Sequence, residues 1–402
     1  MRTKERRDRV VLVAAIRDQR AHLLSVIRYC ALVFLLLRLL TLVVGVVAVG
    51  LVPALDPVGV PGWPAPIAEP GWHNLFTAWE RFDALWFLRI ADEGYRLGDG
   101  SAAFFPLFPL VVRAVSFVAG GHPFGAALVV SNLAFLAALV VTYLLTDLEY
   151  DERRARATVV LLAFFPTSFF FLMPYSESLF LLLAVAAFWF ARRGSWVGAG
   201  IAGALAALTR SVGIALAPAI AIEALHQRAE GRGRAWPGLL AAVATAGGTL
   251  AYLGSWELRA GDLLAPLHTQ QSWERTFSWP WASLWEGTRT AFRYVGDTNG
   301  GYWLLDWLIV IPFLAAAAYA LARSRPSYGV YLLVTLLIPL SFVFEDRTLM
   351  SMPRFVLVVF PAFWAAAEVV ERRRVPALAL AAIGTCGIGL LSVLTVNWYY
   401  VF

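Results

Sequence analysis

The sequence predicts an all-α membrane protein that crosses the bilayer many times, and three observations support this. Hydrophobic residues make up 60% of the 402 residues, charged residues only 15%, and the mean hydropathy is +0.68. A water-soluble domain normally carries about a quarter charged residues. Apolar stretches such as 31–52 also reach the roughly 20 residues that a helix needs to cross the hydrocarbon core.

Short arginine clusters between the apolar stretches orient the chain. Residues 1–29 form a basic N-terminus, which we assign to the cytoplasm because cytoplasmic loops carry an excess of basic residues. A first span at 30–52, with every later cluster on the same side, gives about eleven spans and an outer C-terminus. These clusters are 153–156, 192–193, 228–234, 323–325 and 372–374. The net charge of +6 then reflects loops that face anionic lipids, and we expect no nucleic-acid partner.

Two long segments, about 53–123 and 256–301, are expected to be outer loops of a single transmembrane domain at 30–402. Within the first loop, 102–119 is apolar but interrupted by two prolines and an arginine. A full span there would place the 153–156 cluster outside. We therefore expect a helix that lies at, or dips into, the outer interface.

The segment 196–218 is expected to form two short helices that turn at Arg210, because one straight helix would place the next arginine cluster outside. Its small residues, including Gly198, Gly200 and Gly203, predict close packing against a neighbouring helix.

The segment 79–95 gathers acids, arginines and large aromatic residues beside the membrane. Helical spacing would align Phe82 with Trp86 on one face, with Asp83 beside it. A carboxylate at a half-dry interface is costly unless it is used or paired. Asp83 could accept a proton from an attacking hydroxyl as a general base. The alternative is a solvated interfacial helix, with neighbouring arginines as ion-pair partners.

Short motifs recur in one order along most of the chain from the first outer loop onward. They are Phe82-Asp83-Ala84, Ile90-Ala91, Gly94-Tyr95, Ala103-Phe104-Phe105-Pro106-Leu107-Phe108-Pro109-Leu110, Pro174-Tyr175-Ser176-Glu177-Ser178-Leu179-Phe180, Leu208-Thr209-Arg210-Ser211-Val212-Gly213 and Pro353-Arg354-Phe355. In this combination the chain resembles the PIG-V family: mannosyltransferases of glycosylphosphatidylinositol (GPI) anchor biosynthesis and their bacterial relatives, within the GT-C superfamily of membrane glycosyltransferases. The family usually has tryptophan before the acid, and Phe82 keeps an aromatic residue there.

The resemblance implies a GT-C-type bundle with interfacial helices in the first outer loop. It also implies inverting transfer of a sugar, expected to be mannose, from a polyprenyl-phosphate donor at the non-cytoplasmic face. Asp83 matches the catalytic acid of the first outer loop in GT-C enzymes. The preference for arginine over lysine, and for alanine, suggests a GC-rich bacterial genome, so we expect this multi-pass protein in a bacterial plasma membrane. The acceptor could then be a cell-envelope lipid, glycan or protein.

Cations must stabilise the charge that develops on the departing phosphate. Arg210 and Arg354 are candidates, because a guanidinium binds phosphate oxygens in a bidentate, permanently charged contact. Arg347 is a third candidate. The alternative for Arg210 and Arg354 is that they snorkel to the outer headgroups.

Candidates for binding the sugar or the acceptor are Glu177, Tyr175, Trp86, Asp92 and Glu93. Glu177 could instead be an acid at a helix start, which the helix dipole favours. Asp92 and Glu93 could instead be solvated loop charges.

No cofactor is expected, and a divalent metal has no support from the sequence. The histidines lack ligand spacing, and there is no Asp-x-Asp pair. Two other functions stay open, namely a lipid or solute transporter and a non-catalytic subunit of a glycosylation complex. A transporter usually carries ionisable groups near the midplane. In this chain they gather at the outer ends of spans, which favours an enzyme.

Overall fold

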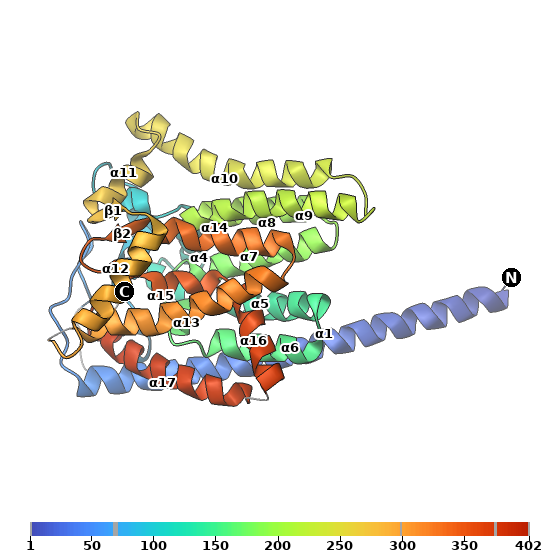
Figure 1. The fold of residues 1–402 in the computed structure, drawn as a ribbon, viewed down its shortest axis with the longest axis horizontal. Helices are drawn as coiled ribbons and strands as arrows, with labels where there is room; N and C mark the ends of the chain where they lie inside the picture. Colours follow the sequence, from blue (N-terminus) through green and yellow to red (C-terminus); the bar gives the residue numbers. More distant parts are fainter. Residues whose placement is uncertain (1, 67–70, 298–299, 374–375, 401–402) are drawn as a thin grey trace.

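The computed structural model describes residues 2–66, 71–297, 300–373 and 376–400. Long helices run side by side along one axis, and short helices with a two-stranded antiparallel ribbon gather at one end (Figure 1). The elements are α1 (Arg2–Leu51), α2 (Asn74–Thr77), α3 (Asp83–Glu93), η1 (Ser101–Ala103), α4 (Leu107–Val118), α5 (Pro123–Glu149), α6 (Glu152–Ala163), η2 (Ser168–Phe171), α7 (Glu177–Arg192), α8 (Trp196–Thr209), η3 (Ser211–Ala215), α9 (Leu216–Ala229), α10 (Trp236–Ala260), α11 (Ala265–Ser272), β1 (Arg275–Phe277), α12 (Pro280–Arg293), α13 (Gly301–Arg323), α14 (Pro326–Leu340), β2 (Phe342–Phe344), α15 (Met352–Phe355), η4 (Val356–Val358), α16 (Pro361–Arg373) and α17 (Ala377–Val396).

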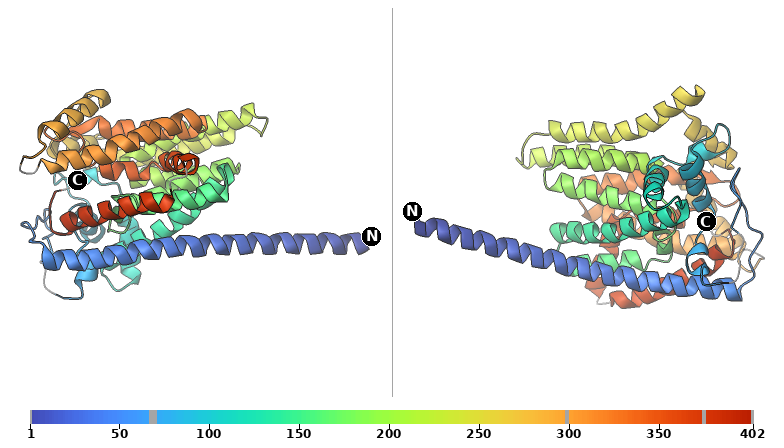
Figure 2. Two further views of the ribbon diagram at one scale, coloured as in Figure 1. Left: turned by 60° about the horizontal axis from the view of Figure 1, so that its bottom comes forward. Right: turned by 180° about the vertical axis from the view of Figure 1, so that it is seen from behind.

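The two ends of the bundle differ in their chemistry. Helix α1 extends beyond the bundle at the end that we call the N-terminal end, whereas α11, α12 and both strands lie at the opposite loop end (Figures 1 and 2). Ion pairs join the arginine clusters at the N-terminal end. Arg192 pairs with Glu149 and Glu223, Arg325 also pairs with Glu223, and Arg154 pairs with carboxylates of α16. The clusters therefore share one end of the fold.

Five of the described helices are long and apolar enough to cross a membrane, and six if the bent pair formed by 352–358 and 361–373 is one span. The five are α1, α5, α10, α13 and α17. The predicted count of about eleven spans is not confirmed. Further apolar helices, α4, α8 and α14, have 12, 14 and 15 residues. At about 1.5 Å per residue, each covers only about 18–23 Å.

Three local expectations can be compared with the helices. Because α4 has only 12 residues, 102–119 does not form a helix of full spanning length, as expected. Helix α8 ends at Thr209, and Arg210 is extended (φ −153°, ψ 150°), which confirms the predicted break. The helix that holds the first span begins at Arg2 instead of near Cys30, because the polar segment before the span continues the same helix.

Close packing of α8 against α10 confirms the interpretation of the small residues. A Cβ added at Gly203 would lie 2.1 Å from Thr245 Oγ1, and one at Gly248 would lie 2.3 Å from the Ala204 carbonyl oxygen. The two backbones therefore approach to a distance that only glycine allows at these positions.

Candidate active site

A cavity of about 300 Å³ lies at the loop end, where the ends of α3, α8, α10, α14 and α15 converge beneath α11 and β1. Its charged lining is Asp83, Arg210, Arg275 and Arg354. Much of the remaining wall is apolar. It includes Phe104, Leu253, Leu267, Ile338, Phe342 and Phe355. The cavity thus combines one acid and three cations with a large apolar surface.

Asp83 is the first residue of α3, and an unusual turn places it there. Phe82 precedes the helix with φ 51° and ψ −119°, a backbone conformation that residues other than glycine rarely adopt. Ring contacts with Trp398 and Tyr400, at centroid distances of 5.3 and 4.9 Å, hold Phe82 in position. The carboxylate of Asp83 lines the cavity and lies 2.6 Å from Nη1 of Arg354.

Glu177 lies behind the cavity and joins two of the arginines. It is the first residue of α7 and is only 1% exposed. Its Oε1 lies 2.6 Å from Nη1 of Arg210 and 3.0 Å from Nε of Arg354. Arg210 also donates to the Ser176 hydroxyl at 3.1 Å. The predicted residues Asp83, Glu177, Arg210 and Arg354 therefore form one charged network, although they come from four separate segments.

Tyr175 connects this network to the turn before Asp83. Its ring lies 5.4 Å from Cζ of Arg354, and its hydroxyl donates to the Arg81 carbonyl at 3.1 Å. The side chain of Arg81 in turn donates to the Val396 carbonyl at 2.8 Å. Tyr175 is buried, and its contacts join Arg354 to the turn before Asp83.

Arg275 is a cavity residue that the sequence did not single out. It lies on β1 opposite Phe344 of β2, and its guanidinium lies over the rings of Phe344 and Phe355 at 4.9 and 5.6 Å. Burial and the nearby Arg354 lower the pKa of Arg275 to about 10, against the opposing effect of Asp83. Several other arginines share the loop 256–301, and no local motif distinguishes this one from them.

Arg347 and the pair Asp92 and Glu93 lie away from the cavity. Arg347 forms a bidentate ion pair with buried Asp306, with Nε–Oδ2 at 2.6 Å and Nη2–Oδ1 at 2.8 Å. Asp92 is exposed at the end of α3, and Glu93 pairs with exposed Arg96. These three predicted site residues are therefore not brought together with Asp83.

Trp86 is buried and contributes to the wall only through its neighbours. Its ring stacks on Phe104 at 5.4 Å and contacts Trp273 edge-on at 5.3 Å, and both of these partners line the cavity. The expected common helical face of Phe82 and Trp86 is wrong, because Phe82 lies outside the helix in the turn before it.

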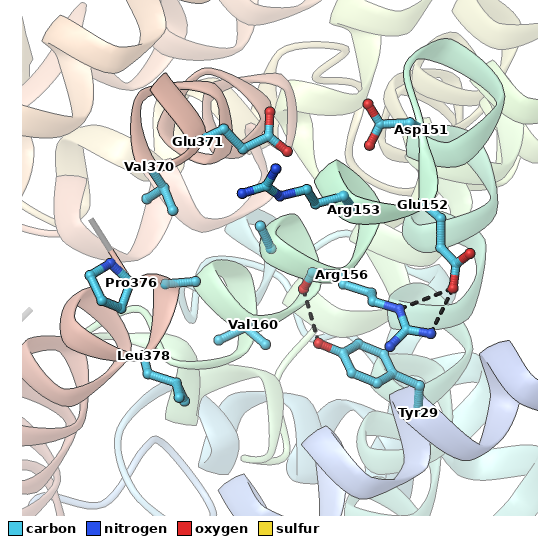
Figure 3. A pocket seen from close by; sticks show the side chains of 12 residues that line it. Tyr29, Asp151, Glu152, Arg153, Arg156, Val160, Val370, Glu371, Pro376 and Leu378 are labelled. Carbon is cyan, nitrogen blue, oxygen red and sulfur yellow. Dashed lines mark hydrogen bonds and ion pairs between the residues drawn. The ribbon is translucent and has the colours of Figure 1, made fainter. Parts of the chain in front are cut away.

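A wider groove of about 1120 Å³ lies at the N-terminal end, lined by residues of α1, α6, α16 and α17 (Figure 3). There Arg156 pairs with Glu152 at 2.6 Å, and the Arg156 carbonyl accepts a hydrogen bond from Tyr29. Glu371 pairs with Arg154. The candidate catalytic residues Asp83, Arg210 and Arg354 line the loop-end cavity and not this groove, so we assign the chemistry to the loop-end cavity.

Among the residues that the structure describes, no three His, Cys, Asp or Glu side chains are grouped so that they could hold a metal ion. The cations that line the cavity are guanidinium groups.

Known proteins resemble this chain in sequence and in fold. The sequence model described as Mannosyltransferase (PIG-V) matches residues 22–230. Apo ArnT from Cupriavidus metallidurans matches with a TM-score of 0.51 and 16% identity, over 91% of this chain and 76% of ArnT. The oligosaccharyltransferase of Archaeoglobus fulgidus matches with a TM-score of 0.40 and 15% identity, over 89% of this chain.

This chain spans about half of the oligosaccharyltransferase, 53% of its length. A search of curated proteins found no significant match. At such low identity the structural neighbours show the fold alone. The family match covers more than half of the chain. The chain therefore belongs to the PIG-V mannosyltransferase family, and its fold is similar to that of ArnT.

Proposed function

We propose that this protein transfers a sugar, with mannose expected from its family, from a polyprenyl-phosphate donor to a hydroxyl of a cell-envelope lipid, glycan or protein, with inversion. The observation that carries the proposal is the placement of Asp83 in one cavity with three arginines. Inverting transfer needs a base for the acceptor hydroxyl and cations for the departing phosphate. The apolar wall suits the polyprenyl chain, because burying it there removes hydrocarbon from water.

In the proposed step, the acceptor oxygen forms a bond to the anomeric carbon while the bond from that carbon to the phosphate oxygen breaks. The acceptor proton goes to Asp83, and the electron pair of the broken bond stays on the phosphate. The lipid phosphate thereby passes from one negative charge to two. The guanidinium groups of Arg210, Arg275 and Arg354 line the cavity in which this charge develops.

The charge of the site supports a donor with a single phosphate. Three arginines lie against two carboxylates, Asp83 and Glu177, which leaves one positive charge uncompensated. A sugar joined to a lipid through one phosphate is a diester with one negative charge, whereas a diphosphate-linked sugar carries two. A buried ligand is favoured when its charge balances that of its site.

The arginine clusters support an orientation with the loop end outside. Because all of them lie at the N-terminal end, the positive-inside rule assigns that end to the cytoplasm and the cavity to the extracytoplasmic side of the plasma membrane. A transporter is less well supported, since the charged network of Asp83 lies at one end of the bundle and not at its middle.

The test is substitution of Asp83 by asparagine, which keeps the size of the side chain and removes the base. The variant is expressed in a strain that lacks its own copy, and membranes receive radiolabelled polyprenyl-phosphate mannose, glucose or arabinose. We expect sugar incorporation into envelope material to fall by at least about a hundredfold, because base catalysis contributes roughly 10²–10⁴ in rate.

Asp92→Asn is the matched control, because Asp92 is an exposed acid of the same helix, and it should leave transfer unchanged. The apparent melting temperature in detergent confirms that both variants fold. Transfer by folded Asp83→Asn at the wild-type rate would remove Asp83 as the base. A subunit that serves only as a structural partner would show this result.

A further inference from the structure

The three arginines of the cavity differ in how their charge is compensated. Arg354 contacts both Asp83 and Glu177, and Arg210 contacts Glu177. Within the described parts of the chain, Arg275 forms no ion pair, and its guanidinium donates to the Ser351 hydroxyl at 3.4 Å. The uncompensated positive charge of the site is therefore carried by Arg275.

The surroundings of Arg275 hold its guanidinium without neutralising it. The β1–β2 pairing fixes its backbone, and the rings of Phe344 and Phe355 lie within 5.6 Å of its Cζ. Stacking on an aromatic ring orients an arginine while leaving its hydrogen-bond donors free. Arg275 faces the cavity from the loop side, so the donor phosphate can reach it before any existing ion pair opens.

By contrast, the positive charge of Arg354 is already compensated by two carboxylates. Its Nη1 lies 2.6 Å from Asp83 and its Nε lies 3.0 Å from Glu177. When Asp83 accepts the acceptor proton it becomes neutral, and this pairing of charges ends. In the same step the lipid phosphate gains its second negative charge. The site thus gains one net positive charge when the leaving group gains one negative charge.

We propose that Arg275 binds the phosphate of the incoming donor, and that protonation of Asp83 frees Arg354 to stabilise the departing phosphate. This division of roles rests on the proposed function, and its covalent step is the transfer already described. It makes Arg275 a substrate-binding residue and gives the ion pair between Asp83 and Arg354 a part in the reaction. Before the proton moves, that pair keeps the second cation away from the phosphate.

The test measures binding of decaprenyl phosphate, a doubly charged monoester at pH 8, to the purified full-length protein in detergent. Arg275→Gln should weaken binding by roughly ten- to a hundredfold, the range expected for a lost hydrogen bond to a charged group. Asp83→Asn imitates the protonated base and should bind the same probe roughly tenfold tighter, because Arg354 then keeps only Glu177 as a partner and the site carries one more uncompensated positive charge. No sugar is transferred in this assay, so binding is separated from catalysis.

Matched controls come from the same regions of the fold. Arg293→Gln removes an exposed arginine of α12, and Asp92→Asn removes an exposed acid of α3, so neither should change the affinity. If Arg275→Gln does not fold, Arg275→Lys takes its place. It keeps the charge but loses the planar fork, and it should bind the probe severalfold more weakly than wild type.

Each binding result tests a different part of the proposal. Unchanged affinity in the Arg275 variant would overturn its role in phosphate binding. Unchanged or weaker binding by Asp83→Asn would overturn the release of Arg354. Failure of the wild-type protein to bind decaprenyl phosphate would instead contradict the donor class of the proposed function, so the two failures are distinguishable.

Discussion

The ion pair between Asp306 and Arg347 makes it possible to separate a structural arginine from a ligand-binding one. Asp306 is 1% exposed and Arg347 is 8% exposed, and two contacts of 2.6 and 2.8 Å join them. Arg347 also donates to the carbonyl oxygens of Tyr400 and Tyr302. Because Tyr400 packs against Phe82, this arginine helps to hold the turn before Asp83.

Arg347→Met leaves the buried carboxylate of Asp306 without its partner. Removing one member of a buried ion pair costs about 3–5 kcal/mol, because the remaining charge is desolvated and uncompensated. Replacing both members, as Asp306→Leu with Arg347→Met, removes the desolvated charge, and we expect it to recover most of the loss. A double-mutant cycle on apparent melting temperatures in one detergent measures this coupling.

The kinetic measurement distinguishes the two roles of Arg347. If Arg347 has a structural role, the double variant should regain stability and have a near wild-type KM for the donor. If Arg347 instead binds the phosphate, the KM should rise in both variants, whether Asp306 is present or replaced by leucine. Wild-type stability in Arg347→Met, combined with a tenfold rise in KM, would refute our placement of Arg347.

Two further predictions concern stability. Gly248→Val places a Cβ 2.3 Å from the Ala204 carbonyl oxygen and should cost about 1–3 kcal/mol in thermal unfolding, whereas Gly247→Val, with no atom within 4 Å of its Cβ, should not. Burial raises the pKa of Asp99, but hydrogen bonds and the buried Arg89 lower it below its usual value overall. The stability from this pair is therefore present above about pH 4 and is lost as the pH falls further. The difference in melting temperature between wild type and Asp99→Asn should shrink as the pH falls below about 4, and a difference that does not shrink there would contradict this.

Properties that depend on neighbouring residues along the chain were predictable. Apolar stretches and arginine clusters predicted a helical membrane protein with its basic segments at one end, and ion pairs confirm that those segments lie together. The break at Arg210 was predicted from the side of the membrane on which the next arginine cluster must lie, and the short helix after Pro106 from its prolines, which interrupt a helix where they occur. The count of about eleven spans is not confirmed, because the lengths of single helices depend on packing as well as on local composition.

The members of the charged network were partly predictable. Asp83, Glu177, Arg210 and Arg354 lie in motifs that resemble a family, and the fold brings all four together. Arg275 has no such motif, and its position follows from pairing of β1 with β2, two strands about 70 residues apart in sequence.

The sequence by itself determined that this chain is a helical membrane protein, and it supplied an acid and arginines suited to transfer from a lipid phosphate. Only the tertiary structure decided which charges neutralise one another. Arg354 is paired with Asp83, Arg347 with Asp306, and Arg275 is left to face the cavity. The physical reason is that Coulomb energy depends on the distance between charges in space, and residues far apart in sequence acquire that distance only when the helices pack.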